Sequence, residues 1–339
     1  MIRFISPAQL RRLGIIGMNR RNVGYVGRCN PRKNYPLVDN KLKTKAAAQR
    51  MAIPVPALYG VIDHQYQVNR IDSLLESLAG FVIKPVQGSG GKGILVVSGR
   101  REGSFVQPSG RSIAVEEVRR HLSNILAGLH SLGGRNDCAM IEALIDFAPY
   151  FRDYSHQGVP DIRVIVYRGV PVMAMLRCAT SASGGKANLH QGAVGIGIDI
   201  GSGRSICAVQ HNRIIERHPD TGAAFDRLVV PHWPEILDLA GRCADMSGLG
   251  YLGADIVLDR QRGPMLLELN ARPGLAIQVA NRTGLQHRLL EADRINRETN
   301  DHGEKLRLAR QRFAVASEVA DSSKDRGISA EAKVLVNCG

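Results

Sequence analysis

The sequence has few aromatic side chains, no closely spaced cysteines and no long apolar run. Only 5% of its 339 residues are aromatic, so a surface that stacks nucleic-acid bases is poorly supplied. No two of the six cysteines form a CxxC pair, which argues against a zinc ribbon or a redox pair and fits a reducing, cytoplasmic compartment. No stretch approaches the roughly 20 apolar residues of a membrane span, and no secretory h-region is recognisable.

What is present is typical of a globular protein. Apolar residues make up 44% of the chain and charged residues 22%, which excludes general disorder. The length allows one large domain or two to three smaller ones, each with a core of its own.

Positive charge is in excess, and much of the excess is local. Lys and Arg number 45 against 31 Asp and Glu, a net charge of +14, which attracts nucleotide phosphates, carboxylates, nucleic acid or acidic lipid. Residues 1–38 hold eight basic residues and no acidic one. Mitochondrial transit peptides can begin in this way. We favour a folded basic arm, because residues 25–38 continue as a turn-rich chain, YVGRCNPRKNYPLV.

Hydrophobic spacing predicts short strands and amphipathic helices, hence the α+β class. Helices are expected at 41–51, 114–132, 234–246 and after Gly284. Strands are expected at 81–84, 94–97, 140–145, 254–258 and 265–269, with a hairpin formed by 161–167 and 170–177. Three further features are a glycine cap on the second helix at 133–134, a functional loop at 181–203 and a frayed tail from Ser317. No strand–GxGxxG–helix or Walker motif is found.

A glycine-rich segment follows the first predicted strand. It reads KPVQGSGGKG from Lys84 to Gly93 and contains four glycines. Glycines let backbone amides approach phosphate closely, and a loop between strands can fold over a nucleotide. A plain hairpin turn explains the residues equally well, so both interpretations stay open at this point.

Two carboxylates and one amide are expected to share one face of a sheet. Glu268 and Asn270 are two apart on a predicted strand and therefore point the same way, and Asp255 lies on the preceding strand. Oxygen ligands of this kind suit Mg²⁺, with Mn²⁺ as an alternative. A solvent-exposed Glu268 is the competing interpretation, but the neighbouring leucines make the strand strongly apolar, and a carboxylate there needs a partner.

Basic residues supply the remaining candidates. Arg272 lies in the turn NARPG, where it could bind a carboxylate substrate or stabilise an oxyanion, or could simply be exposed. A further set consists of Lys45, Arg163, Arg177 and Asn188. Each of them alone would be expected in solvent, and only their combination makes them candidates.

Taken in order, the motifs resemble the ATP-grasp superfamily. They are DNKLKTK…IPVP, VIKPVQGSGGKG, MIEALI, DIRV…MLR, NLHQG and GADIVLD…MLLELNARPG, from about Asp39 to about Gly284. Within the superfamily the chain is most similar to RimK-type glutamate ligases and alpha-L-glutamate ligase-like proteins. The resemblance implies two α+β subdomains that clasp ATP, at 41–140 and 141–290. A short basic arm at 1–40 would stand in place of a full α/β domain, and a charged helical tail would occupy 291–339.

The resemblance also implies roles for single residues. The α- and β-phosphates of ATP would be held by Lys45 and Lys84. The flexible phosphate loop would comprise Gln87, Gly88, Ser89, Gly90, Gly91 and Gly93. The adenine hinge would comprise Glu142, Ala143 and Leu144, with Asp146 on the ribose and Asn188 facing the triphosphate. Magnesium would be held by Asp255, Glu268 and Asn270. The γ-phosphate and an acyl phosphate would be met by Arg163, Arg177 and Arg272.

The implied activity is ATP-dependent carboxylate–amine ligation through an acyl phosphate. Two alternatives remain: an ATP-grasp phosphotransferase without an amine acceptor, and a basic nucleotide-sensing protein that binds nucleic acid or the ribosome. The acceptor could be an amino acid, a peptide or a protein. The RimK-type pattern SNLHRGG reads ANLHQGA here, at 187–193, and the loop at 147–160 is longer. Within the basic arm, we expect Arg28 and Arg32 to fold back beside the nucleotide or substrate, and Arg3, Arg11 and Arg12 to lie in solvent.

Overall fold

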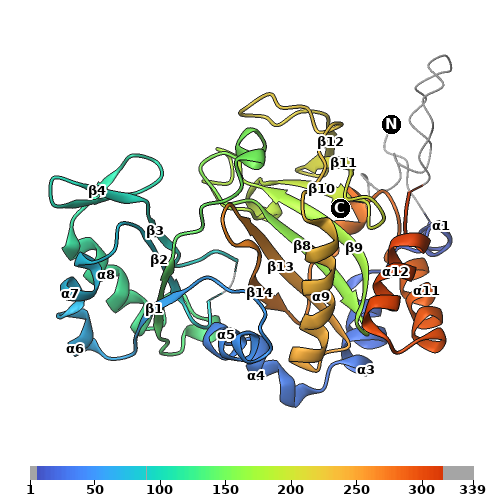
Figure 1. Cartoon of the computed structure of the whole chain (residues 1–339), viewed down its shortest axis with the longest axis horizontal. Helices are drawn as coiled ribbons and strands as arrows, with labels where there is room; N and C mark the ends of the chain where they lie inside the picture. The colour runs from blue at the N-terminus through green and yellow to red at the C-terminus, as the bar shows by residue number, and fades with distance from the viewer. Residues whose placement is uncertain (1–5, 89, 316–339) are drawn as a thin grey trace.

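The computed structural model describes residues 6–88 and 90–315, which form two α+β parts (Figure 1). A cavity lies between them. The smaller part is built on a four-stranded sheet and the larger part on a seven-stranded one. The tail from Ser317 and the candidate Ser89 lie outside the described residues. The predicted α+β class is confirmed.

The larger sheet is antiparallel throughout. Its strands are β8 (Asp161–Tyr167), β9 (Val170–Cys178), β10 (Val194–Ile198), β11 (Ser205–Gln210), β12 (Arg213–Ile215), β13 (Tyr251–Asp259) and β14 (Gly263–Asn270). They lie in the order β12-β11-β10-β9-β8-β13-β14. Because β8, β9 and β13 are apolar along nearly their whole length, both of their faces can be covered, and almost every residue is buried.

Four helices cover this sheet. They are α9 (Trp233–Ser247), α10 (Ile277–Ala280), α11 (Leu285–Glu298) and α12 (His302–Arg312). Helix α9 packs against β8, β9, β13 and β14, whereas α11 and α12 pack against β9. The expected helices at 234–246 and after Gly284 are therefore confirmed, as is the hairpin formed by β8 and β9.

The smaller part carries the glycine-rich segment. Its main sheet has the order β1-β7-β2-β3, with β1 at Leu58–Ile62, β2 at Phe81–Pro85, β3 at Leu95–Val97 and β7 at Ala139–Ala143. Helices α6 (Gln65–Val68), α7 (Ile71–Glu76) and α8 (Val115–Leu126) lie beside it, and a small sheet of β4 (Gly99–Arg101), β5 (Ser104–Val106) and β6 (Ser112–Ile113) completes it (Figure 1).

Two predicted boundaries were wrong. Helix α8 ends at Leu126, because Gly128 adopts a φ of +80° and the next amide, of Leu129, bonds back to the carbonyl of Asn124 at 3.0 Å. This is a Schellman cap, so the glycines at 133–134 are not the cap and Leu129 is 69% exposed. The second error is the loop at 181–203, which contains β10, a fully buried strand inside the larger sheet.

The basic arm is helical and packs against the larger part. Its helices are α1 (Pro7–Arg12), α2 (Met18–Arg20), α3 (Gly27–Cys29) and α4 (Tyr35–Val38), with a π-helical turn at Arg21–Val26 and a 3₁₀ turn at Arg32–Asn34. Ile16, Tyr25, Val26 and Val38 are buried in the larger core. Arg11 and Arg12 are exposed as expected, and Arg3 lies outside the described residues.

Helix α5 (Lys41–Arg50) confirms the first predicted helix and leads from the arm into β1. Its buried residues Ala47 and Ala48 belong to the larger core rather than to the smaller one. Asn40 caps its start by accepting a bond from the amide of Lys43 at 2.9 Å. In the part of the chain that is described, no helix combines the length and apolarity needed to cross a bilayer.

Candidate active site

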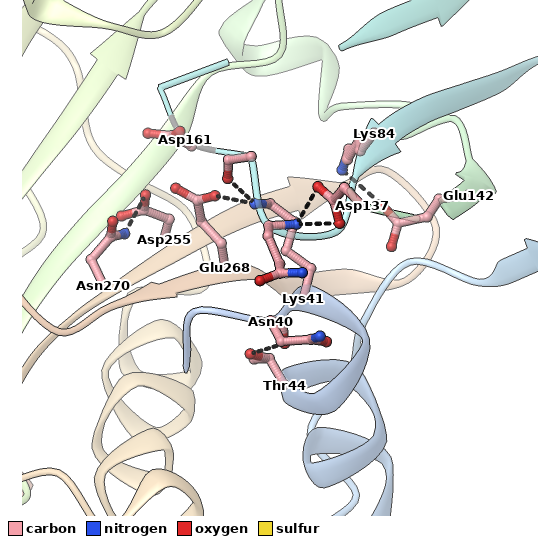
Figure 2. Close-up of polar contacts among 12 residues, drawn as sticks. Asn40, Lys41, Thr44, Lys84, Asp137, Glu142, Asp161, Asp255, Glu268 and Asn270 are labelled. Atoms are coloured by element: carbon pink, nitrogen blue, oxygen red, sulfur yellow. Dashed lines mark hydrogen bonds and ion pairs between the residues drawn. The ribbon is translucent and has the colours of Figure 1, made fainter. Parts of the chain in front are cut away.

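A cavity lies where α5, the sheet of the smaller part and strand β14 meet. Its lining includes Lys41, Thr44 and Lys45 from α5, Lys84 and Glu142 from β2 and β7, and the β14 segment from Leu266 to Asn270. Figure 2 shows Lys84 and Glu142 on one side of this space and Glu268, Asn270 and Asp255 on the other, with α5 below. Residues more than 100 positions apart in the sequence therefore face one another.

Glu142 lies between two lysines. Its carboxylate is 2.5 Å from the Lys45 ammonium and 2.7 Å from that of Lys84. Burial alone would raise the pKa of Glu142, but the two ammonium groups hold it below its usual range. Burial lowers the pKa of Lys45 despite its pairing with Glu142. Lys45 also donates to the carbonyl of Pro56, so two of the predicted nucleotide residues form a buried ionic cluster with the predicted hinge glutamate.

Lys41 lines the cavity but was not selected from the sequence. Its Nζ donates to the carbonyl oxygen of Gly88 at 2.5 Å and lies 4.0 Å from the Glu268 carboxylate (Figure 2). It therefore joins the glycine-rich segment to the candidate metal residues. A sequence signal existed, because Lys41 and Lys45 are four apart on a predicted helix and so share a face.

The glycine-rich segment is anchored at its start by Asp137. This buried carboxylate accepts bonds from the Gln87 amide at 2.9 Å, the Ser131 hydroxyl at 2.6 Å and the Cys138 amide at 2.8 Å. Gly88 forms an isolated β-bridge with Ser131. Asp137 was not selected from the sequence, because it lies 50 positions after Gln87 and outside any recognised motif.

Further along, the segment needs its glycines. Gly90, Gly91 and Gly93 have φ values of 63°, 75° and 71°, a region that other residues rarely adopt. The carbonyl of Gly90 lies 3.4 Å from Asn188 Nδ2 and 3.5 Å from Gln191 Nε2. The predicted residue Asn188 therefore reaches the glycine-rich segment from the larger part.

The predicted metal residues occur together, but Asp255 is already engaged. Its carboxylate accepts two bonds from Arg163, at 2.7 and 2.6 Å, one from Arg177 at 2.7 Å and one from Asn270 Nδ2 at 3.1 Å. Burial would raise the pKa of Asp255, but the two guanidinium groups lower it to about 2. Glu268 is partly exposed, and both Glu268 and Asn270 line the cavity.

Asp161 is a second buried carboxylate in this cluster. It accepts two bonds from Arg177, at 2.5 and 2.6 Å. Burial, together with the nearby charge of Asp255, raises the pKa of Asp161 to about 6, against the effect of Arg177. Two like charges that share one arginine push their pKa values apart. Asp161 begins the motif DIRV, but the sequence alone predicts no role for it.

The remaining candidates lie at the margin of the cavity or outside it. Arg272 lines it and stacks over the ring of Tyr35, 4.9 Å from the centroid. Ala143 and Leu144 follow Glu142 along the chain but are not among the lining residues described. Asp146 pairs with Arg260 at 3.2 Å.

The expectation for Arg28 and Arg32 was wrong. Both are exposed, and neither is among the described residues that line the cavity. Arg28 lies instead at a separate hollow with Arg168. The buried arginine of the arm is Arg21, which donates to the carbonyl of Pro273 at 2.8 Å. Arg21 thus supports the turn that follows Asn270.

This arrangement of a glycine-rich segment, lysines and a β14 carboxylate around one cavity is that of a nucleotide-binding protein of the ATP-grasp class. A family model described as sugar-transfer associated ATP-grasp matches residues 20–294, so the chain belongs to this ATP-grasp family. No curated protein matches the sequence. The predicted superfamily and fold are therefore confirmed, and the match gives no support to the RimK-type subgroup in particular.

Several solved structures are similar at low identity. ATP-grasp ligase PsnB complexed with a minimal precursor is 14% identical, with 83% of this chain and 62% of that chain covered and a TM-score of 0.42. D-cycloserine synthetase DcsG is 13% identical, with coverages of 84% and 73% and a TM-score of 0.43. D-alanyl-alanine synthetase A from Vibrio cholerae is 12% identical, with coverages of 84% and 67% and a TM-score of 0.42. The chain spans less than two thirds of the length of PsnB.

Proposed function

We propose that the chain is an ATP-dependent carboxylate–amine ligase. The observation that carries the proposal is the charge arrangement of the cavity. Lys41, Lys84, Glu268 and Asn270 line the cavity. Arg163 and Arg177 are not among the described lining residues, but both bond Asp255, which also accepts a bond from Asn270. Clustered cations of this kind suit a triphosphate and the charge that moves during phosphoryl transfer.

The proposed reaction has two steps. A carboxylate oxygen of the substrate attacks the γ-phosphorus of ATP, the bond to the β-phosphate oxygen breaks, and ADP leaves an acyl phosphate behind. An amine then attacks the carbonyl carbon, orthophosphate departs, and the nitrogen loses a proton. Lys45 and Lys84, together with Lys41 and the glycine-rich segment, hold the phosphates. The arginines stabilise the transferred group, so catalysis is mainly positioning and charge neutralisation.

Magnesium fits this site through Glu268 and Asn270. A carboxylate and an amide oxygen are hard ligands, and both side chains line the cavity. Asp255 belongs to the same set by sequence, although its oxygens accept four hydrogen bonds from Arg163, Arg177 and Asn270 in the present state. When bound, the ion would neutralise phosphate charge.

The finer assignments are proposals on the same footing. They are a RimK-type glutamate ligase relationship, Glu142 on the adenine amino group, Asp146 on the ribose, Asn188 at the triphosphate, Mn²⁺ as a substitute ion, and a cytoplasmic location. Because the family is described as associated with sugar transfer, amino sugars and sugar acids join amino acids and peptides as candidate substrates.

Amine dependence distinguishes the ligase from a phosphotransferase. We expect phosphate release from ATP to rise several-fold or more when a suitable carboxylate and amine are supplied together, compared with either one alone. Release is measured across a panel of amino acids, peptides, amino sugars and sugar acids, and products are identified by mass spectrometry.

A phosphorylated product that forms without any amine would favour the phosphotransferase instead. A chain that turns over no ATP but binds RNA, with an affinity that falls steeply with salt, would favour the nucleic-acid alternative.

A further inference from the structure

Two buried aspartates and two largely shielded arginines lie beside Glu268 and Asn270. They come from neighbouring strands, with Asp161 and Arg163 on β8, Arg177 on β9 and Asp255 on β13. The sheet register sets two of their pairs directly opposite each other, Asp255 with Arg163 and Asp161 with Arg177. Side chains directly opposite each other on neighbouring strands stabilise the sheet when their charges are opposite.

The two arginines are not equivalent. Arg177 has two carboxylate partners, because it bonds Asp161 through Nε at 2.5 Å and Nη2 at 2.6 Å, and Asp255 through Nη2 at 2.7 Å. In the described part of the chain, Arg163 has Asp255 as its carboxylate partner, through Nε at 2.7 Å and Nη2 at 2.6 Å. Both guanidinium groups are largely shielded, with side chains 13% and 11% exposed.

The number of carboxylate partners decides which arginine is left unpaired when Asp255 turns toward a cation beside Glu268 and Asn270. Asp255 then has to release hydrogen bonds from its arginines. A buried charge left without a partner is costly. Arg177 avoids that cost because Asp161 still holds it by two bonds. Arg163 loses its carboxylate and becomes available to an anionic ligand in the cavity.

We propose that Asp161 is a positioning residue that retains Arg177, so that Asp255 can exchange its arginines for Mg²⁺ while Arg163 is released toward the nucleotide. The assignment rests on the proposed function for the identity of the ligand, a magnesium nucleotide. Asp161 itself touches neither the ion nor the substrate.

The test compares nucleotide binding with and without the ion in the full chain. The binding of ADP is measured by calorimetry in excess Mg²⁺ and in excess EDTA, for the unmodified chain and for Asp161→Asn. In the variant, Arg177 depends on Asp255 alone. We therefore expect ADP affinity in EDTA to be unchanged, and the gain in affinity from Mg²⁺ to fall by about 10- to 100-fold, as for other residues that support metal ligands indirectly.

A matched control and a rescue separate this role from a structural one. Asp199→Asn changes another buried aspartate, which bonds Ser202 and the amide of Val315 away from the cavity, and should keep the full gain. Adding Arg177→Met to Asp161→Asn removes the stranded cation and should restore much of the gain. If Asp161→Asn alone does not fold, this double variant is compared directly with the unmodified chain. Mg²⁺ should then raise ADP affinity in both.

Three outcomes would overturn the assignment. They are an unchanged gain in Asp161→Asn, an equal loss of affinity in Mg²⁺ and EDTA, and a double variant that folds without recovering the gain. An unmodified chain that binds no ADP under either condition contradicts the proposed function as well. If Mg²⁺ raises ADP affinity equally in the unmodified chain and in Asp161→Asn, the result contradicts this assignment but leaves the proposed function standing.

Discussion

Replacing Glu268 with glutamine is expected to reduce ATP-dependent phosphate release by about 100-fold or more, the usual cost of removing one preorganised electrostatic group from a transition state. The substitution keeps the size of the side chain but removes a charge that faces Lys41 at 4.0 Å and lines the cavity. The strand around it is apolar, with Leu266 and Leu269 buried, so Glu268 places a carboxylate at the cavity face of an otherwise apolar strand.

The measurement is phosphate release at saturating Mg²⁺ and ATP, with circular dichroism to confirm that the fold is intact. Glu117→Gln is the matched control, because Glu117 pairs with Arg111 on the surface of α8; it should leave release unchanged. Near-normal turnover in Glu268→Gln would show that β14 does not supply the metal site.

Replacing Glu142 with glutamine is expected to destabilise the protein by about 3–5 kcal/mol, the cost of breaking a buried ion pair from one side. Two ammonium groups, of Lys45 and Lys84, lose their shared counter-ion, and all three side chains are at most 11% exposed. The measurement is the free energy of unfolding in urea. Adding Lys45→Met to this variant removes one stranded charge and should recover part of the loss.

The same cluster predicts a pH dependence. The pKa of Glu142 in the folded state is below its usual value, so its pairing stabilises the fold fully above about pH 4.3, the pKa of an unperturbed glutamate. That stabilisation is lost as the pH falls through the lowered pKa. The difference in unfolding free energy between the unmodified chain and Glu142→Gln should therefore shrink in acid. If this difference in unfolding free energy is small at pH 7, or grows in acid, the stabilising role of the Glu142 ion pairs is contradicted.

The parts of the site that are local in sequence could be predicted. Glu268 and Asn270 share a face because strand residues alternate, and the glycine-rich segment between β2 and β3 is visible from its composition. Helix α5 and the β13–β14 hairpin were expected within a few residues of their observed ends. In each case the evidence lay inside one short segment of the chain.

The parts that depend on packing could not be predicted. Lys41 and Lys45 share a helix face, and only the position of Gly88 and Glu142 relative to α5 shows that Lys41 reaches the glycine-rich segment while Lys45 is buried. The prediction for the basic arm rested on its arginines. Its few apolar residues, including Ile16 and Tyr25, instead anchor it to the larger core. These contacts join positions far apart in the sequence.

The pairing of Asp255 is a long-range property of the same kind. A strand pattern shows which way Asp255 points. Its arginines, however, come from β8 and β9, 92 and 78 positions away, and are aligned by the sheet register. The sequence placed Arg163, Arg177 and Asp255 in different roles, whereas the structure joins them in one network.

The central claim, that this ATP-grasp protein transfers the γ-phosphoryl group of ATP to a carboxylate, is tested most directly by identifying the nucleotide products of turnover. ATP consumed with an accepted carboxylate and amine is analysed by ³¹P nuclear magnetic resonance and ion-exchange chromatography, with Glu268→Gln as the inactive reference. The account predicts ADP and orthophosphate in equal amounts, together with one amide per ATP. AMP and pyrophosphate as products would show that the carboxylate attacks the α-phosphorus, and would contradict the account.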